Sequence, residues 1–136
     1  MTEPGPNRAR YLPDIGPKED ADALLNDLKA LTWASACEHA ILQLRGGRRV
    51  LVSAGKFGID LEVVGVHAVS QRSELVFLEI DRLRVRVVGL EMHVHPQPTG
   101  PSDRDIMVLT LLNQESSLLY ELNGDEEGTT FRRKSW

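Results

Sequence analysis

The chain of 136 residues is 41% hydrophobic and 26% charged, which is the size and balance of one ordinary globular domain. Its net charge of -4 argues against a nucleic-acid partner, because nucleic-acid binders normally carry a basic excess. The single cysteine, Cys37, excludes an internal disulfide and a cysteine-rich zinc site, and it favours a reducing, cytoplasmic setting. We also expect no membrane partner, because no apolar stretch has the length of a signal peptide or a membrane span.

The N-terminal part is predicted to be a tail followed by a helix. Residues 1–18 contain four of the seven prolines and few apolar residues, so we expect a flexible tail there and a single domain over 19–136. Leucines at helical spacing, with acidic residues ahead of them, predict the first helix over about 20–34.

The rest of the chain alternates strand-like runs with turns. Strict alternation of arginine with apolar residues over 82–87 is typical of a strand that is wet on one face. Prolines and a glycine make 96–101 a loop, and Ser102 begins a second helix that ends near Asn113 or Gln114. This order predicts a mixed α+β or α/β sandwich of one domain. The expected strands are 40–44, 49–52, 59–69, 74–80, 82–87, 117–122 and 129–132.

A candidate metal site is predicted where the middle strands give way to the second helix. His93 and His95 are two residues apart, so on a strand both imidazoles point to one face. Asp105, one turn into the helix, could supply a third ligand at about 2.0 Å and leave the fourth position of a zinc ion to water. Ser102 could donate a hydrogen bond to an oxyanion beside the metal.

A hydrolytic site of this kind also needs a general base for the attacking water. Glu38 is the first candidate, because it immediately precedes the apolar run 40–44 and could reach a cleft from the sheet edge. Glu91 is the second, because it shares the strand parity of His93. Simpler interpretations exist: Ser102-x-x-Asp105 is close to a helix capping box, and Glu38 could be a surface carboxylate.

The ordered pattern resembles the JAB/JAMM (MPN+) metallopeptidase family. The likeness is carried by His-x-His-Pro, a short proline-rich loop, Ser-x-x-Asp at a helix start, and an upstream glutamate before a strand. It implies that His93, His95 and Asp105 bind zinc, that Ser102 supports the transition state and that Glu38 is the acid/base. It also implies a curved mixed β-sheet flanked by helices, a cytidine-deaminase-like sandwich, and hydrolysis of peptide or isopeptide bonds in protein substrates, often beside ubiquitin-like or carrier proteins.

The resemblance covers roughly residues 36–122 and is most similar to compact JAB-like domains attached to bacterial polymorphic toxins, for which export as part of a toxin system is possible. Two spacings differ from the family pattern: six residues instead of seven separate His95 from Ser102, and Gly89 lies one position further upstream. A shift of one residue on a strand turns a side chain to the other face. The alternative is therefore a catalytically inactive module of the same fold that binds proteins.

The remaining chemically reactive residues are given structural roles. His39 and His67 each lie beside apolar residues, so we expect them to be packed or hydrogen-bonded rather than metal ligands. Cys37 has no adjacent base in the sequence and is expected to be a small core residue. The arginines of 82–87 are expected to form a solvated sheet face.

Overall fold

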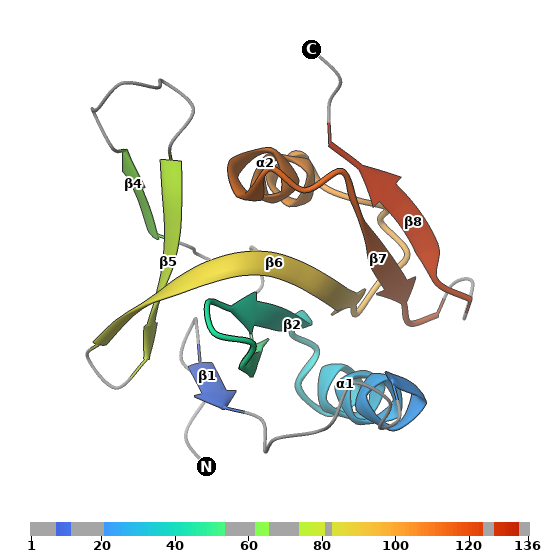
Figure 1. Cartoon of the computed structure of the whole chain (residues 1–136). Coiled ribbons are helices and arrows are strands. Elements are labelled where there is room, and N and C mark those ends of the chain that lie inside the picture. The colour runs from blue at the N-terminus through green and yellow to red at the C-terminus, as the bar shows by residue number, and fades with distance from the viewer. Residues whose placement is uncertain are drawn as a thin grey trace.

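A computed structural model describes residues 8–11, 21–53, 62–65, 74–80, 83–123 and 127–133. In chain order, these ranges contain one strand, one helix, five strands, a second helix and two strands (Figure 1). Neither of the described helices has the length and apolar character needed to cross a membrane. The elements are β1 (Arg8–Tyr11), α1 (Ala21–Ser35), β2 (His39–Leu44), β3 (Arg49–Ser53), β4 (Glu62–Gly65), β5 (Glu74–Ile80), β6 (Leu83–His95), α2 (Asp103–Leu112), β7 (Ser116–Glu121) and β8 (Thr129–Arg132).

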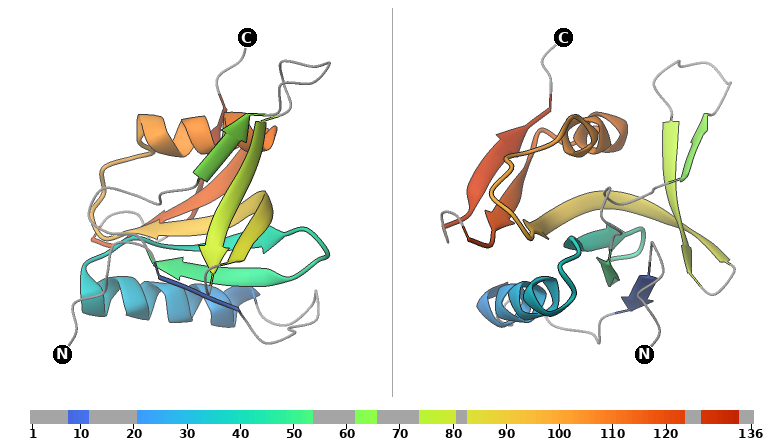
Figure 2. Two further views of the ribbon diagram at one scale, coloured as in Figure 1. Left: turned by 90° about the vertical axis from the view of Figure 1, so that its left-hand side faces the viewer. Right: turned by 180° about the vertical axis from the view of Figure 1, so that it is seen from behind.

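The fold is a small α+β domain built on one mixed, open sheet. Six strands follow the order β1-β3-β2-β6-β5-β4, and β7 pairs in parallel with the last residues of β6 and antiparallel with β8. The long, curved β6 is the centre, because its first half pairs with β5, its second half with β7, and its other edge with β2 (Figure 1). α1 covers one face and α2 the other, as the views in Figure 2 also show.

Each face of the sheet has its own apolar cluster. On the α2 face, Leu109 of the helix packs with side chains of β2, β3, β5, β6, β7 and β8. On the α1 face, Leu28 packs with Ile41 and with Met92 and Val94 of β6. The apolar run of β2 is buried on both faces, as expected for a strand that lies between two layers.

Two irregularities in the pairing of β6 with β2 decide which side chains face α2. The register shifts between Ile41 and Leu42 and again between Gln43 and Leu44, so Val88 and Glu91 are the extra residues of β-bulges. After each extra residue, the side chains that would have pointed to one face of the sheet point to the other. The α2-facing residues of β6 therefore include Val87, Leu90 and His93 rather than a regular series of every second residue.

Most of the predicted elements are confirmed, with three differences. The predicted tail includes β1, which pairs with β3 and is a strand that the prolines of residues 1–18 led us to exclude. The strand predicted over 82–87 continues to His95, and Leu83 at its start is 68% exposed rather than packed inward. Within the predicted strand 59–69, the described part is Glu62–Gly65. The exposure of Arg84 and Arg86 confirms a solvated arginine face for the described part of that run.

Candidate metal centre

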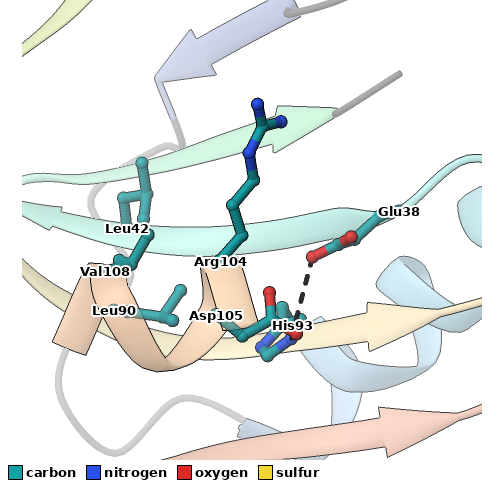
Figure 3. A pocket seen from close by; sticks show the side chains of 7 residues that line it. All are labelled: Glu38, Leu42, Leu90, His93, Arg104, Asp105 and Val108. Atoms are coloured by element: carbon teal, nitrogen blue, oxygen red, sulfur yellow. Dashed lines mark ion pairs between the residues drawn. The ribbon is translucent and has the colours of Figure 1, made fainter. Parts of the chain in front are cut away.

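Four side chains from three separate elements meet beneath the first turn of α2. Glu38 immediately precedes β2, His93 and His95 end β6, and Asp105 lies in the first turn of α2. Each offers one ligand atom, and these atoms all lie within 4.8 Å of one another. Figure 3 shows Glu38 and Asp105 on either side of His93. The cluster could therefore hold a metal ion.

Strand register brings Glu38 to the two histidines. Ala40 of β2 is paired with His93, and it packs in the α2-face cluster. Glu38 is two residues before Ala40 and so lies on the same face of the sheet. His93 and His95 lie on that face as well, because both follow the bulge at Glu91.

Asp105 is held in place by a capping box at the start of α2. The backbone N–H of Asp105 donates to Ser102 Oγ at 3.1 Å, and the backbone N–H of Ser102 donates to Asp105 Oδ2 at 2.9 Å. That same carboxylate oxygen lies 3.3 Å from His93 Nε2 and 3.1 Å from His95 Nε2. The cap thus aims one carboxylate oxygen at both imidazoles.

Three of the four ligand atoms form a compact triangle. Its edges are 3.1 Å between the two Nε2 atoms, 3.3 Å from His93 Nε2 to Asp105 Oδ2, and 3.1 Å from His95 Nε2 to the same oxygen. Zinc bonds of about 2.0–2.1 Å in a tetrahedron place neighbouring ligand atoms about 3.3 Å apart. The triangle fits a cation of this size to within a few tenths of an ångström, so these three side chains suit a zinc ion.

Glu38 lies slightly outside this triangle. Its Oε1 is 3.7 Å from His93 Nε2 and 3.6 Å from His95 Nε2, and its side chain is 12% exposed. At this distance the carboxylate can serve as a fourth ligand, or it can accept a proton from a water that occupies the fourth position. A fourth protein ligand closes the site, whereas a proton acceptor leaves one position of the ion open to water.

Burial and charge shift the pKa values of the cluster strongly. Burial lowers the pKa of His95, but hydrogen bonds and charge from Asp105 and Glu38 outweigh it and raise that pKa to about 9. Burial raises the pKa of Asp105, but His93 and His95 outweigh it and hold that pKa well below its usual range. Below its raised pKa, the protonated imidazole of His95 supplies positive charge beside the Asp105 carboxylate.

Comparisons with protein-family models, with curated proteins and with solved structures give no significant match to this chain. Membership of the JAB/JAMM family therefore stays a prediction.

The alternative base, Glu91, is not part of the cluster. Its carboxylate forms an ion pair with Arg49 of β3, although the sequence predicted that it would share a face with His93. The physical reason is the β-bulge, which places Glu91 itself at the extra position and breaks the parity between residues 91 and 93. The structure thus brings Glu38, and not Glu91, to the histidines.

The other predicted residues have structural contacts. Ser102 is an exposed helix cap, and its oxyanion role stays a prediction. His39 is buried and its Nδ1 lies 3.2 Å from Thr32 Oγ1 and 2.9 Å from the carbonyl of Cys37, so the prediction that it is hydrogen-bonded is confirmed. Cys37 is half-buried rather than fully in the core, and His67 lies outside the described residues.

Two contacts of the histidines were not predicted from the sequence. His95 Nδ1 lies 3.2 Å from the hydroxyl of Thr99, a residue of the proline-rich loop. The ring of Phe131 meets the ring of His93 edge-on, with 5.2 Å between centroids. The contact with Thr99 could have been expected, because Thr99 is four residues from His95 in a tight loop. Phe131 is distant in the sequence, so nothing there indicates its contact with His93.

A small pocket adjoins the cluster (Figure 3). Its volume of about 20 Å³ is roughly the room that one water molecule needs. Polar groups border it on one side and aliphatic side chains on the other. The lining residues are Glu38, Leu42, Leu90, His93, Arg104, Asp105 and Val108.

Proposed function

We propose that this protein is a zinc-dependent metallohydrolase that cleaves a peptide or isopeptide bond. The observation that carries the proposal is the triangle of His93, His95 and Asp105 ligand atoms, with the Glu38 carboxylate beside it. Two imidazoles and one carboxylate are a common donor set for catalytic zinc, which keeps one position open. Iron(II) also uses this set, and elemental analysis separates the two metals.

The protein residues have distinct tasks in this reaction. A bound zinc ion supplies a Lewis acid and lowers the pKa of a coordinated water to about 7. Glu38 accepts the proton of the attacking water and delivers it to the leaving nitrogen as the new carbon–oxygen bond replaces the carbon–nitrogen bond. The Ser102 hydroxyl accepts the Asp105 N–H and keeps its own proton, which is free to stabilise an oxyanion.

The pocket supports a site with room beside the ligands. Glu38, His93 and Asp105 border a space of about one water molecule, which suits a water next to its proton acceptor. The aliphatic side chains of Leu42, Leu90 and Val108 complete the lining of this space. The resemblance adds the substrate class: a protein or peptide, including conjugates of ubiquitin-like or carrier proteins, in the cytoplasm or in a bacterial toxin system.

A second candidate function is a binding module that is catalytically inactive. The position of Glu38 favours it, because a carboxylate oxygen within 3.7 Å of both Nε2 atoms can itself take the fourth position. Zinc sites closed by four protein ligands are structural rather than catalytic. The metal would then tie β2, β6 and α2 together beneath a protein-binding surface.

The test compares zinc-loaded wild-type protein with the variants Glu38→Gln and Asp105→Ala on a proteome-derived peptide library and a panel of isopeptide-linked peptides. Mass spectrometry counts newly formed N-termini and released lysine side chains. A hydrolase produces cleavage that both variants and chelator treatment abolish. Equal product from wild type and Glu38→Gln contradicts the proposed mechanism, and zinc uptake without any cleavage by wild type favours the binding module.

A further inference from the structure

We propose that Thr99 is a positioning residue that fixes His95 with its Nε2 atom toward the metal. This inference rests on the proposed zinc site and assigns a role to a loop residue that touches neither the ion nor the substrate. Groups that hydrogen-bond the second nitrogen of a ligating histidine orient the ring and tune its basicity.

The hydrogen bonds around Thr99 select one tautomer of His95. The Thr99 hydroxyl donates to the carbonyl of Gly100 at 3.3 Å, which uses its only proton. With its proton directed to that carbonyl, the hydroxyl oxygen is placed to accept from His95 Nδ1, which lies at 3.2 Å. A neutral His95 with its proton on Nδ1 has a lone pair on Nε2, the atom that faces Asp105 and His93.

The loop that carries Thr99 is itself held in place. The backbone N–H of Gly100 donates to Glu121 Oε2 at 2.7 Å, and Leu122 N–H donates to the carbonyl of His95 at 3.0 Å. Both contacts come from the end of β7, which pairs in parallel with the end of β6. Thr99 is therefore anchored to the sheet although it is exposed to solvent.

The two histidines differ at Nδ1: in His95 this atom lies beside the Thr99 hydroxyl, and in His93 it has no corresponding contact among the described residues. Within the described part of the chain, His93 Nδ1 is buried without a hydrogen-bond partner, and the ring lies between His95 and Phe131 in edge-on contacts. Packing restrains the ring of His93, whereas a specific hydrogen bond selects the protonation pattern of His95. Removing that bond takes away the contact of His95 Nδ1 with Thr99, while the ring keeps its edge-on contact with His93.

The test is zinc affinity, measured by competition with a chromophoric chelator, for wild type, Thr99→Val and Thr99→Ser. Valine keeps the shape of threonine and lacks the hydroxyl, and serine keeps the hydroxyl. Thr99→Val should weaken zinc binding about 10- to 100-fold, and Thr99→Ser should stay within about threefold of wild type. Thr130→Val, on exposed β8, is the matched control and should bind as wild type does.

The outcomes separate this inference from the proposed function. If wild type binds zinc and Thr99→Val binds equally well, the positioning role is wrong and the zinc site stands. If Thr99→Ser loses as much affinity as Thr99→Val, the hydroxyl is not the cause and the positioning role is again wrong. If wild type takes up no zinc, both the proposed function and this inference fail. Circular dichroism of the metal-free variants confirms that each is folded.

Discussion

Raising the pH of the metal-free protein should weaken its fold through His95. The pKa of His95 is raised from 6.5 to about 9 in the folded protein, mainly because Asp105 and Glu38 overcome the effect of burial. A group with a raised folded pKa contributes stability that is complete below its unfolded pKa and is lost as the pH rises through its folded pKa. The loss should therefore occur between about pH 6.5 and pH 9.

The magnitude follows from the size of this shift. Each pKa unit corresponds to about 1.4 kcal/mol, so the difference between 6.5 and about 9 corresponds to at most roughly 3.5 kcal/mol of unfolding free energy. His95 is buried, with 7% of its side chain exposed, so solvent screening reduces this value little. Sharing of the same carboxylates with His93 makes it an upper bound.

Urea unfolding with a chelator present, at pH 6.5 and at pH 9, measures this loss. Asp105→Asn is the matched control, because an amide oxygen can still accept the Ser102 N–H of the capping box but carries no charge. We expect this variant to lose much less stability over the same interval. An unfolding free energy of wild type that stays constant between the two pH values, or falls equally in Asp105→Asn, would refute the charge coupling.

Three further predictions concern the metal and the two glutamates. Zinc binding at pH 7 should release protons, because His95 must lose its proton to coordinate the ion. Titration calorimetry in buffers of different ionisation enthalpy measures the number of protons released. A binding heat that does not depend on the buffer would contradict this prediction. Glu38→Gln should lower kcat about 10²- to 10⁴-fold while zinc stays bound, whereas loss of zinc from this variant would identify Glu38 as a ligand. Glu91→Gln should leave zinc affinity within about twofold of wild type, and it should lower the free energy of unfolding by about 1 kcal/mol because it weakens the ion pair with Arg49. Loss of zinc from this variant would instead make Glu91 part of the metal site.

The core of the site could be predicted because it depends on local rules. Two histidines at strand spacing, a proline-rich loop and a helix cap each follow from a few neighbouring residues. The direction in which Asp105 points is set by its own cap, so sequence alone placed it toward the strand end. For Glu38, the apolar pattern predicted that the run after it is a strand, whereas the position of that strand beside β6 came from the structure.

Long-range pairing set the features that could not be predicted. The bulges at Val88 and Glu91 depend on how β6 pairs with β2, and no local pattern signals them. They removed Glu91 from the face of the sheet that carries the two histidines. The strand Arg8–Tyr11 exists through its pairing with β3, so composition alone suggested a tail.

Elemental analysis of the purified protein is the most direct test of the metal centre. After exposure to zinc and removal of excess metal, wild type should retain about one zinc ion per chain, and His93→Ala and Asp105→Ala should retain little. Retention of less than about a tenth of an equivalent by folded wild type, or equal retention by the ligand variants, would contradict a site built from His93, His95 and Asp105.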